Sequence, residues 1–147
     1  MRLSGLIRGL CPGSAVCHVT FFYMMKAYHG DEKIKDKYLK RVREHAESDR
    51  IIKGQYWEDG KGCAVGCTVE SNDHSAYESE LGIPEVLAHL EDDIFEGLPN
   101  DLAMTWPERF LKAIPVGADL SKVWRGFAIY LLEDEKQAGG KHPQCKI

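Results

Sequence analysis

Two cysteines four residues apart are the most chemically suggestive feature of this sequence. They lie in the string Gly62-Cys-Ala-Val-Gly-Cys67, and His74 follows shortly after. On a helix this spacing places both sulfurs on one face, so Cys63, Cys67 and His74 are candidate zinc ligands. A structural zinc site usually has a second closely spaced ligand pair, which this sequence lacks. Zinc is therefore one interpretation, and the packing of two small buried side chains is the other.

The same string also allows a nucleophilic interpretation of Cys63. A glycine-rich helix start would place the positive end of the helix dipole beside the Cys63 thiolate, with Lys61 adding to it, and would lower the thiol pKa. His74 or His45 would then serve as the base, although no pattern brings either one to Cys63. Cys63 and His74 are thus the catalytic candidates, and the sequence does not decide whether the protein is an enzyme.

A block of acidic residues occupies the middle of the chain. Residues 62–108 contain eleven Asp and Glu and no Lys or Arg, whereas both flanking segments are net basic. The block either neutralises those flanks within the fold or attracts a basic protein partner. Only 33–43 is dense in Lys and Arg, so nucleic-acid binding is not clearly indicated. The candidate interaction surface consists of Glu85, Glu91, Asp92, Asp93 and Glu96.

Length and composition predict one domain. The chain has 147 residues, of which 44% are hydrophobic, and this is enough for one core. Its five cysteines are odd in number and scattered, which favours reduced thiols in a cytoplasmic protein. The apolar run over 15–25 is too short to span a bilayer, and we expect no membrane segment. Residues 1–25 are interpreted as a disordered leader or an over-extended start.

Helix signals dominate the rest of the chain. Asp31 is the expected N-cap of a helix over 31–50, whose apolar stripe is Ile34, Tyr38, Val42 and Ala46, widened by Leu39 and His45. A short helix should follow Asn72-Asp73 and end at Leu81-Gly82. A further helix is expected over 84–96, with the charged residues outside and a buried stripe of Val86, Leu87, Leu90, Ile94 and Phe95.

Two more helical patterns complete the domain. Apolar residues recur from Leu102 to Ile114, where Pro107 should kink the helix or split it. The most regular pattern opens near Asp119 and comprises Leu120, Val123, Trp124, Phe127, Ala128 and Leu131. We therefore predict an all-α, single-domain cluster of about five short helices over 26–134, followed by a flexible tail over 135–147.

The segment 54–70 has two interpretations. As a helix, 62–69 would present Gly62 and Gly66 on one face, so that another backbone could approach closely. As a hairpin, Tyr56-Trp57 would pair with 67–69 across the Asp59-Gly60 turn. We favour the Gly-rich helix over the small hairpin.

The string from Gln55 to Cys67, which contains the pattern YWxxGxGCxxGC, resembles a group of uncharacterised bacterial and phage-associated proteins. Glu80-Leu-Gly-Ile-Pro84 and the segments 94–99 and 113–119 share this resemblance. It implies no activity or site.

Two functions follow from the sequence. The favoured one is a small interaction module whose acidic central surface binds a basic protein or, through the basic first helix, another copy of itself. The alternative is a thiol- or zinc-dependent protein that uses Cys63, Cys67 and His74.

Overall fold

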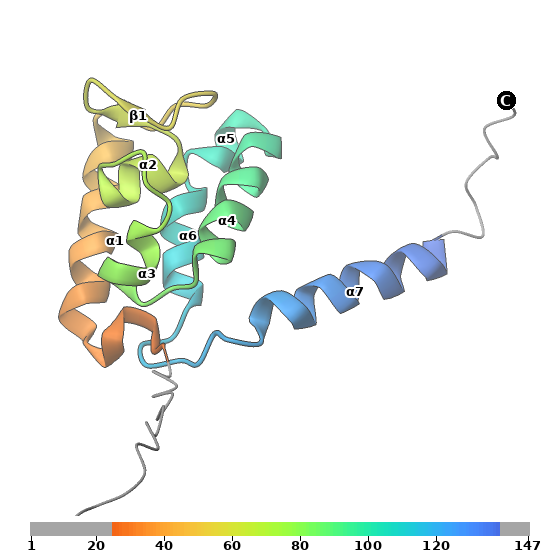
Figure 1. The fold of residues 1–147 in the computed structure, drawn as a ribbon. Coiled ribbons are helices and arrows are strands. Elements are labelled where there is room, and N and C mark those ends of the chain that lie inside the picture. The colour runs from red at the N-terminus through yellow and green to blue at the C-terminus, as the bar shows by residue number, and fades with distance from the viewer. Residues whose placement is uncertain (1–24, 139–147) are drawn as a thin grey trace, which may run out of the picture.

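The fold is built around a short central helix, α2 (Ala64–Val69), in which every residue is buried (Figure 1). The computed structural model describes residues 25–138. Helix α2 packs against α1 (Glu32–Glu47), α4 (Glu85–Gly97) and α6 (Trp106–Ala113). A helix surrounded on all sides needs an apolar surface all round, and small side chains let its neighbours come close. The string of Ala, Val, Gly, Cys and Thr in α2 meets both requirements.

Shorter elements connect these helices. They are the 3₁₀ helix η1 (Ala27–Gly30), the strands β1 (Trp57–Glu58) and β2 (Lys61–Gly62), and the helices α3 (Ala76–Leu81), α5 (Asn100–Ala103) and α7 (Val123–Ala138). The all-α fold class is thus confirmed. The described residues contain seven α-helices rather than about five, partly because the 100–115 segment is divided between α5 and α6 as Pro107 predicted.

Helix α1 begins as expected and buries a slightly different stripe. The Asp31 side chain accepts a 2.8 Å hydrogen bond from the Lys33 amide and so caps the helix. Tyr38 and Val42 are buried, but Ala46 is exposed and His45 is buried in its place. Each step of four residues turns the side chain about 40° further round the helix, because the period is 3.6 residues. After three such steps from Ile34, the position reached is Ala46, which has turned away from the core and faces solvent.

Both interpretations of 54–70 are partly correct. Strands β1 and β2 form a two-residue hairpin in which Trp57 pairs with Gly62, and α2 follows it directly. The pairing of Tyr56-Trp57 with 67–69 was wrong, because 67–69 belong to α2. The close approach expected at the glycines is confirmed, since a Cβ on Gly62 would lie 1.9 Å from the Tyr56 carbonyl oxygen.

Polar side chains from early elements fix the ends of later helices. Lys35 donates from Nζ to the carbonyls of Lys112 (3.1 Å) and Ile114 (2.7 Å), where α6 ends. The Tyr28 hydroxyl donates a 2.7 Å hydrogen bond to the Leu111 carbonyl. These bonds satisfy carbonyls that a helix end leaves without partners.

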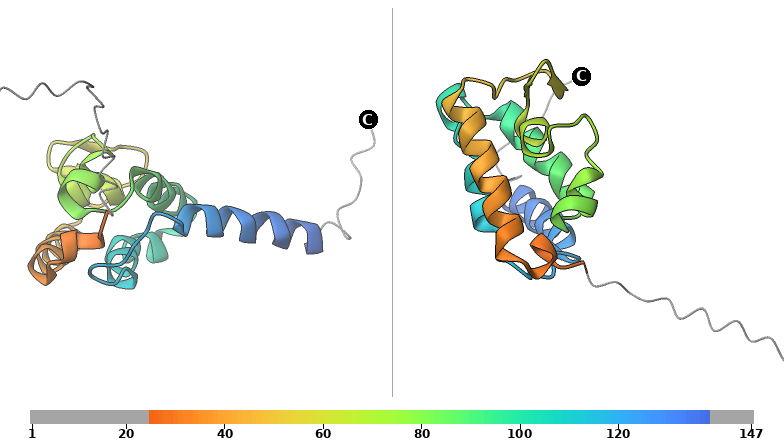
Figure 2. Two further views of the ribbon diagram at one scale, coloured as in Figure 1. Left: turned by 60° about the horizontal axis from the view of Figure 1, so that its bottom comes forward. Right: turned by 90° about the vertical axis from the view of Figure 1, so that its left-hand side faces the viewer.

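Helix α7 departs most from the expectation. It does not pack closely against any other described helix and extends away from them, as Figure 1 and the left view of Figure 2 show. It continues to Ala138, and the flexible tail over 135–147 stays a prediction. Residues 139–147 and the predicted leader up to residue 24 lie outside the described residues. Over the described range, no helix combines the length and apolarity needed to cross a membrane.

Candidate functional site

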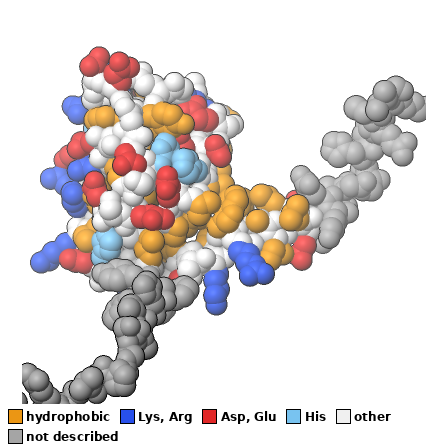
Figure 3. All heavy atoms as spheres, viewed as in Figure 1, with side chains coloured by type: hydrophobic (Ala, Val, Ile, Leu, Met, Phe, Trp, Pro, Cys, Tyr) orange, Lys and Arg blue, Asp and Glu red, His pale blue; other side chains and the backbone are white. Residues whose placement is uncertain are grey.

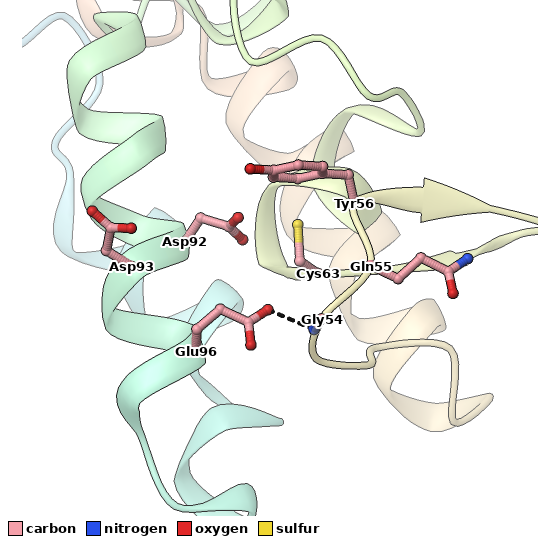
Figure 4. A pocket seen from close by; sticks show the side chains of 7 residues that line it. All are labelled: Gly54, Gln55, Tyr56, Cys63, Asp92, Asp93 and Glu96. Carbon is pink, nitrogen blue, oxygen red and sulfur yellow. Dashed lines mark hydrogen bonds between the residues drawn. The ribbon is translucent and has the colours of Figure 1, made fainter.

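A pocket of about 260 Å³ lies between α4 and the loop that leads into β1 (Figure 4). Three acidic residues line its α4 side, the loop forms the opposite wall, and one cysteine lies between them. The lining residues are Gly54, Gln55, Tyr56, Cys63, Asp92, Asp93 and Glu96. In Figure 4 the Asp92 and Glu96 side chains point across the pocket toward the loop, and Asp93 is turned to the outside.

The geometry of α4 explains why two carboxylates face the loop. Asp92 and Glu96 are four residues apart, so they project from the same side of the helix. Oε1 of Glu96 accepts a 2.9 Å hydrogen bond from the Gly54 amide. Lys53 donates from Nζ to the carbonyls of Glu96 and Leu98 at the end of α4. The loop is therefore held against α4 by two of its own groups, the Gly54 backbone amide and the Lys53 side chain.

Asp92 is the most unusual residue of the pocket. It is only 8% exposed, and its Oδ1 atom has no hydrogen-bond partner. Its other oxygen lies 3.8 Å from Nε2 of His74, which is too long for a hydrogen bond. Burial raises the pKa of the carboxyl above its ordinary value. The Cys63 thiol and the Val65 amide offset part of this rise. A buried carboxylate oxygen without a hydrogen-bond partner is nevertheless costly.

Aromatic rings lie close to Asp92, and Tyr56 is the one that lines the pocket. The His74 ring stacks on that of His89 at 4.4 Å and meets the Tyr56 ring edge-on at 5.0 Å. His74 is 9% exposed, and its Nε2 atom has no hydrogen-bond partner. Tyr56 is 55% exposed, so its ring separates the pocket from solvent only in part.

The two cysteines of the Gly/Cys string serve different contacts. Cys63 caps α2, with Sγ accepting a 3.4 Å hydrogen bond from the Gly66 amide, and it lines the pocket. Cys67 Sγ donates toward the carbonyls of Gly62 (3.3 Å) and Arg50 (3.5 Å) instead. The two sulfurs therefore contact different backbone groups and are not directed at a common ligand position.

Thiol chemistry at Cys63 differs from the expectation. Burial, together with the neighbouring Asp92 carboxyl, raises the pKa of the Cys63 thiol, and burial raises that of Cys67 to about 12. The lowered pKa expected for Cys63 was wrong because desolvation outweighs the cap hydrogen bond from Gly66. A resting thiolate nucleophile is not supported by this geometry.

The zinc ligands proposed from the sequence are not assembled. Over residues 25–138, no three His, Cys, Asp or Glu side chains are grouped so that they could hold a metal ion. His74 lies beside Asp92 rather than beside Cys67, whose sulfur is directed at the backbone. Zinc binding stays a prediction, and no ligand geometry in the described chain adds to it.

The acidic interaction surface needs a correction at two of its five residues. Asp93 and Glu96 are exposed and Glu85 is half-buried, but Glu91 and Asp92 are buried. The buried stripe of α4 is Leu87, Ala88, Glu91, Asp92 and Phe95, and Val86 is exposed. Helix α4 packs against three helices, α2, α3 and α6. Its buried face is therefore wider than the predicted apolar stripe and includes Glu91 and Asp92.

Sequence reasoning missed the loop side of the pocket. Gly54, Gln55 and Tyr56 have no residue types or spacing typical of a binding site, although they directly precede the Gly/Cys string. The glycines of that string were the one feature that could have indicated this wall of the pocket, because they allow the Tyr56 backbone to lie against α2.

Comparison with known proteins adds no relative: no protein-family model matches the chain, and neither a curated protein nor a solved structure does. The resemblance to uncharacterised bacterial and phage-associated proteins therefore stays a prediction. Over the described residues, the fold and the site define a small all-α domain with an acidic pocket lined also by Tyr56.

Proposed function

We propose that this chain is a small interaction module that binds a basic protein partner by taking a Lys or Arg side chain into the acidic pocket. The observation that supports this most directly is Oδ1 of Asp92, a buried acceptor without a donor. A guanidinium or ammonium group in the pocket supplies the opposite charge. It also supplies the missing hydrogen bond once Oδ1, which solvent does not reach in this structure, turns toward it. Buried charges in proteins are paired, so a cationic ligand relieves the cost of an ionised Asp92.

The surroundings of Asp92 fit a cation better than other ligands. Asp93 and Glu96 add negative charge at the same pocket, and neither Lys nor Arg is among its lining residues. Tyr56 presents an exposed aromatic ring, which attracts a cation placed over its face. Most small-molecule sites have about 300–1,000 Å³, so a pocket of about 260 Å³ suits a single side chain.

A second hollow extends the surface on the other side of Tyr56. It is shallower, has about 550 Å³, and is lined by Gln55, Tyr56, Trp57, Glu58 and Asn72. Gln55 and Tyr56 belong to both depressions. The residues next to the inserted cationic side chain would rest here, beside the further carboxylate of Glu58. Figure 3 shows acidic and histidine side chains gathered on one face of the body, with Lys and Arg along its edge.

The test is titration calorimetry of the full chain with the peptide acetyl-Gly-Arg-Gly-amide. The control ligand is the same peptide with citrulline, which keeps the shape of arginine and removes its charge. We expect the arginine peptide to bind more tightly, with an affinity that falls as salt rises. Asp92→Asn should weaken binding at least tenfold, because it removes the charge and puts an amide next to the ligand.

Asp101→Asn is the matched control variant, since Asp101 is an exposed carboxylate on α5, outside the pocket. It should bind the arginine peptide like the unaltered chain. Equal affinity for the arginine and citrulline peptides, or equal losses in both variants, would contradict the proposal.

The thiol- or zinc-dependent alternative is kept for one reason: Asp92, which lines the pocket together with Cys63, lies 3.8 Å from Nε2 of His74. Elemental analysis of protein purified under reducing conditions without a metal-affinity tag distinguishes it. About one zinc per chain, lost on His74→Ala, would favour the alternative over the cation-binding pocket.

A further inference from the structure

Helix α7 exposes apolar side chains on nearly all its sides. Six large ones are between 43% and 63% exposed, namely Val123, Trp124, Ile129, Tyr130, Leu131 and Leu132. In Figure 3 they form a continuous apolar arm that projects from the body. Monomeric proteins rarely expose a contiguous apolar patch beyond about 300–600 Å². A helix that is apolar all round is normally buried, so α7 needs a partner that the described chain does not supply.

Charges on α7 differ between its two ends. Lys122 and Arg125 lie where the helix begins, and Glu133, Asp134, Glu135 and Lys136, which together are net acidic, lie beyond its apolar part. Two copies of α7 that ran parallel would place like charges together at both ends. An antiparallel arrangement places the basic start of each copy beside the acidic part of the other and also opposes the two helix dipoles. The helix is therefore complementary to itself in one orientation.

From this apolar surface and charge order we infer that α7 is a self-association helix, which pairs with α7 of a second copy of this chain in antiparallel orientation about a two-fold axis. The contact is isologous, so each copy contributes the same surface and the assembly closes as a dimer. Large apolar side chains with a charged rim are the composition of homodimer interfaces. The inference concerns a different surface from the pocket and does not depend on cation binding there.

The body of the protein leaves room for this pairing. Helix α7 points away from α1 to α6 in Figure 1 and in the left view of Figure 2, so a second copy has access to it. A Cβ placed on Gly126 would meet no atom within 4 Å, which shows that the chain's own body does not cover that side of the helix. Phe127 and Ala128, on the stripe with Trp124 and Leu131, are half-buried.

Sedimentation velocity of the full chain over 5–200 µM tests the inference. We expect a species of twice the 16.6 kDa chain mass that dissociates on dilution. Leu131→Glu should raise the dissociation constant at least tenfold, because it puts a charge into the apolar face. Leu102→Glu is the matched control, since Leu102 is 43% exposed on α5 and Leu131 is 45% exposed on α7. It should leave the dimer unchanged.

Orientation is tested by reversing one end of the helix. The double variant Lys122→Glu, Arg125→Glu should weaken an antiparallel dimer, because four acidic clusters would then meet. Adding Glu133→Lys and Asp134→Lys should restore it. In a parallel dimer the basic residues of the two copies already repel each other, and the double variant would replace them with acidic residues that also repel. An unchanged dissociation constant for the double variant therefore overturns the antiparallel arrangement. A monomer at 200 µM, or equal effects of Leu131→Glu and Leu102→Glu, overturns self-association through α7.

Discussion

The carbonyl oxygen of Tyr56 lies directly against Gly66, at a distance where no side chain fits. A Cβ on Gly66 would be 1.7 Å from this oxygen, and one on Gly62 would be 1.9 Å from it. The same tyrosine turns its ring outward to line the pocket and meet His74. The Gly/Cys string thus positions one wall of the candidate site by letting the Tyr56 backbone approach α2. The contact between Tyr56 and Gly66 therefore affects both the packing around α2 and the position of the pocket wall.

Substitution of Gly66 by alanine should destabilise the protein strongly. Overpacking usually costs about 1–3 kcal/mol, and we expect Gly66→Ala at or above the upper end because the clash is with backbone. Gly126→Ala is the control, since its Cβ would enter open space in a helix, where alanine is favoured. Chemical denaturation measures both. If the two variants lost equal stability, the close approach of Tyr56 would not be what requires glycine at 66.

A buried carboxyl in the core should make stability depend on pH. Glu91 is fully buried, and its Oε2 accepts a 2.5 Å hydrogen bond from the Tyr77 hydroxyl. Burial raises the pKa of Glu91 well above its usual 4.5. The folded state then holds a proton that the unfolded state releases, so this contribution is present below about pH 4.5 and lost as pH rises to the folded pKa. Glu91→Gln should flatten this decline in the free energy of unfolding.

The measurement is urea denaturation of both proteins at several pH values between 4.5 and 8. Tyr77→Phe serves as a control that keeps the carboxyl and removes its donor, so it should leave the direction of the decline in place. A wild-type curve parallel to that of Glu91→Gln over the whole range would show that Glu91 does not titrate in this window.

Thiol reactivity should be low at both described cysteines. Cys63 is 1% exposed and Cys67 is 0% exposed, and burial raises both pKa values. Iodoacetamide reacts with the thiolate, so both residues should be alkylated only as fast as the protein unfolds. Peptide mapping by mass spectrometry after labelling at pH 8 follows each site separately. Fast alkylation of Cys63 in native protein would return the nucleophilic interpretation to consideration.

Local signals carried much of the fold. The Asp31 cap, the close approach at Gly62 and Gly66, and the break before Pro107 each depend on one or a few neighbouring residues, and the structure confirms all three. The hairpin partner of Tyr56-Trp57 was wrong because the tight Asp59-Gly60 turn pairs Trp57 with Gly62, which lies close to the turn, whereas 67–69 belong to α2.

The site was only partly predictable because its important groups contradict local rules. Asp92 was placed on the acidic helix, but its burial depends on the loop at 54–56 and on α2, which no periodicity in α4 reveals. A carboxylate on an amphipathic helix normally faces water, and Glu91 and Asp92 both depart from this. Helix α7 shows the opposite failure: its regular apolar pattern predicts burial, but six of its large apolar side chains are exposed among the residues that the structure describes.

If Asp92 holds the cation, the affinity for the arginine peptide should rise with pH. The carboxyl pKa is raised above its usual 3.8 by burial, and a cation binds the ionised form, so binding strengthens as pH rises through that pKa and then levels off. Glu96 and Asp93 contribute negative charge on the α4 side, Cys63 faces Asp92 from α2, and His74 approaches it from the start of α3.

Calorimetry between pH 4 and 8 with two variants separates these contributions. His74→Gln removes the histidine charge and should retain most of the rise, whereas Asp92→Asn should bind weakly at every pH with a flat profile. A rise that vanished in His74→Gln but persisted in Asp92→Asn would assign the pH dependence to the histidine. The buried oxygen of Asp92 would then not be the acceptor for the ligand.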